Sequence, residues 1–249
     1  MRAAPPSPRW SVVIPAYNEA RRLPRYLYEV LSYFDGRDEP YEVLVVDDGS
    51  RDDTAARVEE MAAEHPALRV LVHPGNRGKG AAVRAGMRDT RGSLRLMADA
   101  DGATPIVEVK RLEAAIQAGA DIAVGSRALP DPSVVVRARA HRRLSGRLFH
   151  GATRAVGVRS VVDTQCGFKL FRGPVADALF AALRTDGFGF DVELLLRAER
   201  AGYRIAEVPV NWADQPGSKV GVLKDGPRML AEILSARLRL AGRPRGRRR

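Results

Sequence analysis

A chain of 249 residues, 45% of them hydrophobic, is long enough to fold as one large α/β domain with a proper core. Its single cysteine, Cys166, excludes an intramolecular disulfide and a cysteine-cluster metal site, and no apolar run approaches the roughly 20 residues that cross a bilayer. The formal charge of +11 is concentrated in two segments, because 134–160 and 233–249 each contain seven arginines and no acidic residue. This distribution favours an anionic partner, which can be a phosphorylated substrate, a membrane surface or a nucleic acid.

The first half of the chain alternates short apolar runs with amphipathic stretches, after a Pro-rich leader at 1–9. Helical spacing between the first two runs places Leu23, Leu27 and Leu31 on one helix face. Strict alternation of strand and helix predicts an α/β fold in which a mostly parallel sheet carries helices on both faces. The predicted strands are 10–15, 41–46, 68–73, 94–101 and 121–127.

Polar clusters follow each of these predicted strands. Ligands of open parallel sheets bind beyond the carboxyl ends of the strands, so clusters at those ends predict one shared site. The clusters are Asn18-Glu19, Asp47-Asp48, Asn76–Lys79, Asp99 with Asp101, and Arg127.

Asp99 and Asp101 stand at the end of a buried strand, shortly before the helix-starting Pro105. In an extended chain, side chains two positions apart point the same way, so both carboxylates can face one point. Two such oxygen ligands suit Mg²⁺ or Mn²⁺ that is also held by the phosphates of a substrate. The alternative is that Asp101 caps the following helix while Asp99 lies in a solvated turn.

Two common nucleotide-binding motifs are absent from the sequence. A dinucleotide-binding turn needs Gly-x-Gly-x-x-Gly after the first strand, but residues 15–19 contain no glycine. A P-loop needs a glycine at position 73 and a Ser or Thr at position 80, where this chain has His73 and Gly80. The remaining possibility is a site with carboxylates for the base or ribose and a metal for the diphosphate.

Beyond Leu129 the strict alternation ends. The last predicted helix, 224–241, places Leu230, Ile233, Leu234, Leu238 and Ala241 on one face, and arginines crowd its other faces and the tail. Such a helix suits a membrane interface, and the alternative is a terminal helix packed on the domain. The other predicted elements are one or two helices in 134–160, a strand at 163–171, helices at 174–183 and 190–202, and a strand at 205–212.

Five motifs follow one another along the chain: Val13–Glu19, Val46–Ser50, Asn76–Gly80, Asp99–Asp101 and Gly125–Arg127. Together they resemble those of the inverting nucleotide-sugar glycosyltransferases of the GT-A (Rossmann-like) fold, over roughly residues 10–220. Within that family, further strings look most similar to the dolichyl-phosphate β-glucosyltransferase branch of the polyprenyl-phosphate sugar synthases. Those strings are Asp99–Thr104, Asp163–Phe171, Phe190–Leu194 and Asn211–Lys219, and Ala103 replaces the amide of the mannosyl relatives.

The resemblance implies transfer of glucose from UDP-glucose to a polyprenyl or dolichyl phosphate, with inversion and with help from Mg²⁺ or Mn²⁺. It implies that Asp99 and Asp101 hold the metal. The implied catalytic residues are Asp101, Asp163 and Asp191, although Asp163 and Asp191 can equally serve as a turn residue and a helix cap. The implied donor-binding residues are Pro15, Ala16, Tyr17, Glu19, Asp47, Asp48, Arg77, Lys79, Asp99, Ala100 and Asp101, and the acceptor phosphate is assigned to Arg127, Arg142, Arg143, Gln165 and Lys219.

These expectations place a glycosyltransferase domain at 10–222, with a donor half at about 10–128 and an acceptor half at about 129–222. The amphipathic helix and Arg-rich tail at 223–249 predict a peripheral protein on the cytoplasmic face of the membrane, bound to an anionic surface. Alternatives are a dolichyl-phosphate mannose synthase-like enzyme, a glycosyltransferase with a soluble hydroxyl acceptor, and a nucleic-acid binder. Nucleic acid is not the expected partner, because no aromatic residue that could stack on bases occurs from 224 onward.

Overall fold

The computed structural model describes residues 8–137, 151, 154, 157–216 and 222–241. Within these residues, seven strands form one sheet in the order β3-β2-β1-β4-β7-β5-β8. Only β7 runs antiparallel to its neighbours in this described sheet, so the predicted mostly parallel sheet is confirmed. The strands are β1 Trp10–Ala16, β2 Tyr41–Asp47, β3 Leu68–Val72, β4 Leu94–Ala98, β5 Ile122–Ser126, β7 Phe168–Arg172 and β8 Ile205–Pro209.

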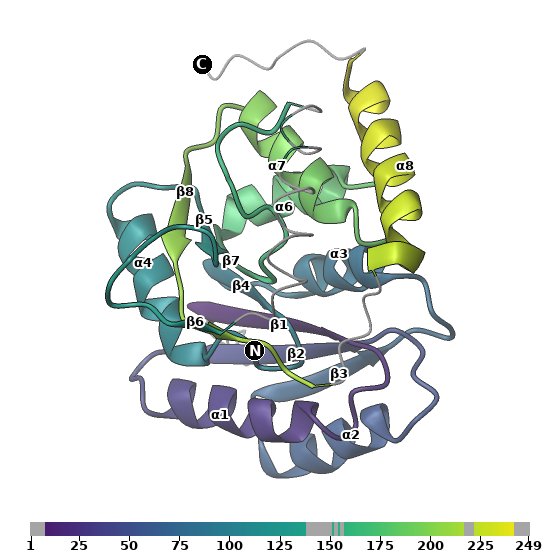
Figure 1. The fold of residues 1–249 in the computed structure, drawn as a ribbon. Helices are drawn as coiled ribbons and strands as arrows, with labels where there is room; N and C mark the ends of the chain where they lie inside the picture. The colour runs from purple at the N-terminus through teal and green to yellow at the C-terminus, as the bar shows by residue number, and fades with distance from the viewer. Residues whose placement is uncertain (1–7, 138–150, 152–153, 155–156, 217–221, 242–249) are drawn as a thin grey trace, which may run out of the picture.

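Helices cover both faces of the sheet (Figure 1). Alternate side chains of β1 enter two separate cores, with Val12 and Ile14 on one face and Val13 on the other. The first core contains α1 Leu23–Asp35, α2 Thr54–Glu64, the short η1 Ile106–Glu108 and α4 Val109–Gln117. The second contains α3 Lys79–Asp89, α6 Gly173–Ala182, α7 Phe190–Arg200 and α8 Val222–Ala241.

Three strands differ from their predicted bounds by three residues or more. The strand expected at 94–101 ends at Ala98, because the chain turns at Asp99. The strand expected at 163–171 begins only at Phe168, since the preceding residues form loop contacts. The run 205–212 is divided between β8 and a second, two-stranded sheet, in which β6 Val136–Arg137 pairs with β9 Trp212–Ala213. Most of the helical region expected in 134–160 lies outside the described residues.

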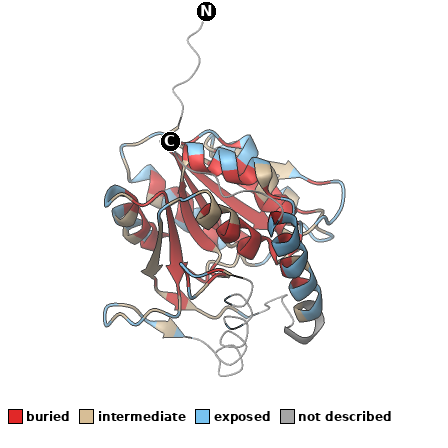
Figure 2. Cartoon of the chain, turned by 90° about the horizontal axis from the view of Figure 1, so that it is seen from above, coloured by how far each residue is buried: buried red, intermediate tan, exposed pale blue. Residues whose placement is uncertain are grey.

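Helix α8 has two apolar faces, and the prediction of one face was wrong. Met229, Ile233, Ala236 and Leu240 are buried on the domain. Leu230, Leu234 and Leu238 point outward and are 45%, 49% and 74% exposed, and Figure 2 shows the outer side of this helix as exposed. No helix within the described part of the chain combines the length and apolarity required to span a bilayer.

Candidate active site

The antiparallel strand β7 brings two distant parts of the chain to the same edge of the sheet. Phe168, at the start of β7, pairs with Ala98, at the end of β4. Residues 163–167 therefore lie at the edge where the parallel strands β1, β2, β4 and β5 end. The polar clusters that follow those strands meet at this edge, as their position in an open sheet predicts.

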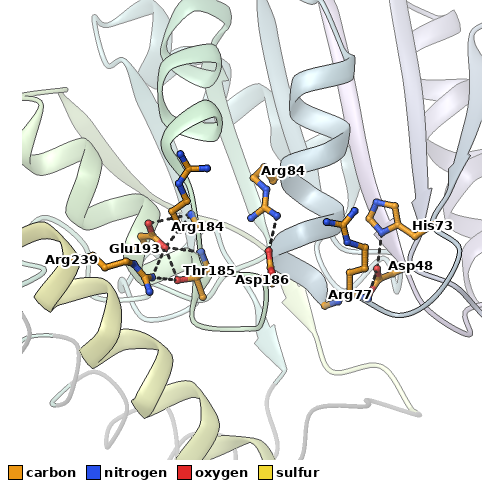
Figure 3. Close-up of polar contacts among 10 residues, drawn as sticks. Asp48, His73, Arg77, Arg84, Arg184, Thr185, Asp186, Glu193 and Arg239 are labelled. Carbon is orange, nitrogen blue, oxygen red and sulfur yellow. Dashed lines mark hydrogen bonds and ion pairs between the residues drawn. The ribbon is translucent and has the colours of Figure 1, made fainter.

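Asp48 holds the loop that precedes α3. Its carboxylate accepts hydrogen bonds from the backbone amides of Arg77, at 3.0 Å, and Gly78, at 2.7 Å. Nδ1 of His73 lies 2.8 Å from the same carboxylate (Figure 3). Asp47 accepts one bond from the amide of Ser50, and its Oδ2 is buried with no hydrogen-bond partner among the described residues. Asp48 therefore shapes the loop before α3, and its binding to the donor stays a prediction.

The loop after β1 is fastened to the turn after β2. The amide of Asn18 donates to Ser50 Oγ, and the amide of Glu19 donates to Thr54 Oγ1, both at 2.8 Å. Gly49 sits in this turn at φ +70°, and a Cβ there would overlap the backbone of Gly75. The sequence-predicted Pro15 and Ala16 are the last residues of β1, and Tyr17 follows them half-buried.

The carboxylates of Asp99 and Asp101 lie beside cationic side chains. Asp99 Oδ1 is 2.6 Å from Lys79 Nζ, and Asp101 Oδ2 is 3.9 Å from Arg22 Nη1. Burial and the neighbouring charge of Asp99 raise the pKa of Asp101 above its ordinary value. Burial opposes the charge on Lys79, but Asp99 and Asp191 together raise the pKa of that ammonium group. The carboxylate pair is therefore only partly neutralised by the chain itself.

Gly167 explains how Asp99 fits at this position. A Cβ at Gly167 would overlap the present position of the Asp99 carboxylate, so a larger residue there would require that side chain to move. The buried Ala100 follows Asp99, and Asp101 Oδ1 accepts a bond of 3.1 Å from the amide of Ala103.

The donor set at Asp99 and Asp101 fits a divalent metal that is shared with a substrate. Carboxylate oxygens are the hard ligands that Mg²⁺ and Mn²⁺ prefer, and burial, followed by the charge of Asp99, disfavours the ionised form of Asp101 in the absence of a cation. No group of three or more His, Cys, Asp or Glu side chains in the described ranges is arranged to hold a metal. The remaining ligands would have to come from phosphate oxygens and water.

A buried ion pair lies behind this site. Lys169 is fully buried in β7, and its Nζ donates to Asp191 Oδ1 at 2.5 Å and to the carbonyl of Cys166 at 2.6 Å. Burial raises the pKa of Asp191 even though Lys169 and Lys79 oppose that shift. The Asp191 carboxylate thus binds a lysine and does not act as the helix cap that was the alternative prediction. Lys169 was not among the predicted residues, although a lysine between Phe168 and Leu170 of an apolar strand is unusual.

Asp163 is bonded to Arg127 through both of its oxygens. Arg127 donates from Nε and Nη2, each at 2.7 Å, and from its backbone amide at 2.9 Å. Burial works in the opposite direction, but the charge and hydrogen bonds of Arg127 hold the pKa of Asp163 below its ordinary value. The guanidinium carbon also lies 5.4 Å from the centre of the Trp212 ring. Arg127 is therefore locked in place at the end of β5.

The other predicted acceptor residues are only partly described. Gln165 is half-buried in the loop before β7. Arg142, Arg143 and Lys219 lie outside the described residues. Arg22 was not predicted, yet it binds Glu19 through Nε at 2.7 Å and Nη2 at 2.5 Å and approaches Asp101.

Comparison with known proteins gives consistent matches. Glycosyl transferase family 2 matches residues 11–180. The chain is 38% identical over 247 residues to the human dolichyl-phosphate beta-glucosyltransferase, covering 94% of this chain and 76% of that protein. It is 41% identical over 220 residues to dolichyl-phosphate beta-glucosyltransferase ALG5C of Trichomonas vaginalis, covering 84% of this chain and 65%, or slightly under two thirds, of that relative.

The solved structures agree on the fold. Glucosyl-3-phosphoglycerate synthase from Mycobacterium tuberculosis, in complex with uridine diphosphate, superposes with a TM-score of 0.68 at 24% identity, covering 92% of this chain and 80% of that one. The same enzyme with Mn²⁺, UDP-glucose and phosphoglyceric acid gives a TM-score of 0.66 at 23% identity, covering 95% and 81%. The sheet, the charged edge and these matches agree with the sequence motifs: the chain belongs to glycosyl transferase family 2, and it is a glycosyltransferase of the GT-A fold.

Proposed function

We propose that the protein transfers glucose from UDP-glucose to a polyprenyl phosphate, such as dolichyl phosphate, with inversion at the anomeric carbon. Relatives named as dolichyl-phosphate beta-glucosyltransferases, 35% to 41% identical over most of the chain, support the acceptor class and the sugar. The edge of the sheet supports a nucleotide-sugar donor, because residues 15–19 and 75–79 flank two carboxylates that can share a divalent metal with a diphosphate.

The choice of acceptor depends on the hydrogen bonds of Asp163 and Asp191, the two carboxylates considered as a general base. Asp163 is bonded twice to the Arg127 side chain at 2.7 Å, and Asp191 is bonded to Lys169 at 2.5 Å. A hydroxyl acceptor needs a general base, because its pKa lies far above neutral. A phosphate monoester is already largely dianionic near neutral pH, since its second pKa is about 6. Engaged carboxylates therefore favour a phosphorylated acceptor.

The same edge supplies groups for the donor diphosphate. Asp99 and Asp101 would hold Mg²⁺ or Mn²⁺ together with the diphosphate oxygens, and the bound metal would supply positive charge to the departing UDP. Lys79 lies 2.6 Å from Asp99 and adds a cation on the donor side. Glu19 fixes Arg22, which lies 3.9 Å from Asp101. These residues bind and orient the leaving group.

The reaction is then a direct displacement. An oxygen of the acceptor phosphate attacks the anomeric carbon from the side opposite UDP, a new C–O bond forms, and the bond to the UDP oxygen breaks with its electron pair. Arg127, held by Asp163, is the described cation on the acceptor side. Alignment of two anions and neutralisation of their charge are the main contributions of the protein.

The test is product formation with purified full-length protein, a short polyprenyl phosphate and either Mg²⁺ or Mn²⁺. We expect UDP-glucose to give glucosyl-phosphoryl-polyprenol whose anomeric proton coupling in NMR identifies the β configuration. GDP-mannose in place of UDP-glucose tests the mannose-synthase alternative in the same assay. An α-linked product, or a clear preference for GDP-mannose, would contradict this function.

We further propose that the outer face of α8 rests on an anionic membrane surface. Replacing Leu230, Leu234 and Leu238 by glutamine is expected to weaken binding to phosphatidylglycerol vesicles. Burial of these three exposed side chains in the membrane contributes about 3 kcal/mol to the binding free energy, which corresponds to about a hundredfold in affinity. Vesicle cosedimentation measures the change.

The matched control replaces exposed apolar residues on the other face of the sheet, Tyr28 and Val107, by glutamine. This control is expected to bind vesicles as the unchanged protein does. Equal binding by the α8 variant and the control would show that the leucine face does not contact the membrane.

A further inference from the structure

A groove of about 530 Å³ runs along α3, and neither Asp99 nor Asp101 lines it. Its floor consists of small or apolar side chains, among them Leu71, Ala81 and Ala85. Four arginines line it, two of them, Arg84 and Arg88, on α3. The others are Arg77, in the loop before α3, and Arg184, in the loop after α6 (Figure 3). The volume lies within the range of small-molecule sites.

Only part of the positive charge of this groove is neutralised by the described chain. Its two acidic residues already have partners, since Asp186 binds Arg84 at 2.6 Å and Asp89 binds Arg69. The guanidinium groups of Arg88 and Arg184 have no hydrogen bond or ion pair with any described residue. Arg84 keeps one nitrogen, Nη1, buried without a partner in the same described set. The groove therefore carries several positive charges and no available counterion.

The walls of the groove are fixed. The amide of Thr185 donates to Glu193 at 2.8 Å, which holds the loop after α6 against α7. Arg239 of α8 donates to the hydroxyl of Thr185 at 3.0 Å and so joins this wall to the last helix (Figure 3). These bonds hold the backbone that carries Arg184 beside α3.

We propose that the part of this groove lined by Arg84, Arg88 and Arg184 is a second anion site, distinct from the Asp99 and Asp101 edge, and that it binds a phosphate group. Guanidinium groups match phosphate oxygens in a planar, two-pronged geometry, and arginines without a counterion that line one groove, as Arg88 and Arg184 do, are stabilised when such an anion enters. The phosphate can belong to a soluble phosphate compound or to the headgroup of an anionic lipid, and both present the same chemistry. This inference does not depend on the proposed acceptor of the transfer reaction.

The test compares two double variants of the full chain. Arg88→Gln with Arg184→Gln removes two unpaired groove charges. The matched control, Arg25→Gln with Arg57→Gln, removes two exposed arginines from α1 and α2, on the opposite face of the sheet. Both variants have the same net charge and keep every active-site residue, so any anion that binds at the catalytic edge affects them equally. Pyrophosphate titration by calorimetry and cosedimentation with phosphatidylglycerol vesicles are the two measurements.

We expect the groove variant to lose at least tenfold in affinity in one of the two measurements, with the control unchanged. Loss in the pyrophosphate titration assigns the site to soluble phosphates, and loss only with vesicles assigns it to lipid headgroups. Equal losses in both variants would show general surface electrostatics, and no loss in either would show that no anion binds there; each result overturns the proposal. Neither measurement uses transfer activity. The result therefore stands whether or not the proposed transfer reaction is correct.

Discussion

Asp101→Asn is expected to lower kcat/KM for glycosyl transfer by about a thousandfold, the size of effect seen when one group that stabilises developing charge is lost. Asp101 and Asp99 form the carboxylate pair at the end of β4. Burial and the charge of Asp99 raise the pKa of Asp101. Removing its charge relieves repulsion in the free protein, so the free energy of unfolding should not fall. Steady-state kinetics and thermal unfolding together measure the two effects.

The control for that variant is Asp38→Asn, which alters an exposed carboxylate in the turn before β2. It is expected to keep full activity. Transfer should also stop when a chelator removes divalent metal and return when Mg²⁺ or Mn²⁺ is added back. Full activity of Asp101→Asn, or full activity in excess chelator, would contradict the metal role of the pair.

Lys169→Met is expected to lower the free energy of unfolding by about 3–5 kcal/mol, because it leaves the buried Asp191 carboxylate without its partner. The double variant Lys169→Met with Asp191→Leu replaces the ion pair by apolar side chains. Such replacement is often neutral for stability, so the double variant should unfold close to the unchanged protein. Denaturant unfolding of both variants measures the difference.

Activity separates the role of this pair from stability. Asp191 raises the pKa of Lys79, which lies beside Asp99, so loss of the Asp191 charge changes the active-site edge even in a stable protein. We expect the stable double variant to transfer poorly. Lys110→Met, at an exposed lysine on α4, is the control and should change neither property. Full activity of the double variant would show that Lys169 and Asp191 serve only the stability of the fold.

The sheet was predictable because its signal is local. Each of the first five strands is a short apolar run that ends in polar residues, and helices with a regular apolar face separate them. The meeting of the polar clusters at one edge followed from the same pattern, since parallel strands end there. The place of β7 between β4 and β5 could not be predicted in this way, because strand order depends on long-range packing that no single apolar run encodes.

The partners of the charged residues were not predictable from the sequence. Arg127 and Asp163 are 36 positions apart, and Lys169 and Asp191 are 22 positions apart. A carboxylate at a turn or helix start has several local interpretations, and only the fold shows which cation it meets. The two faces of α8 show the same limit, since one apolar helix can pack on a domain and present leucines outward.

The most direct test of the account compares two acceptors that differ only in the phosphate. Initial rates of glucosyl transfer from UDP-glucose are measured with a short polyprenyl phosphate and with the matching polyprenol, in the same detergent and at the same metal concentration. Because Asp163 and Asp191 are both engaged by cations, we predict transfer to the phosphate and none above background to the alcohol. Equal rates for the two acceptors would contradict a lipid-phosphate acceptor and favour a glycosyltransferase that uses a hydroxyl.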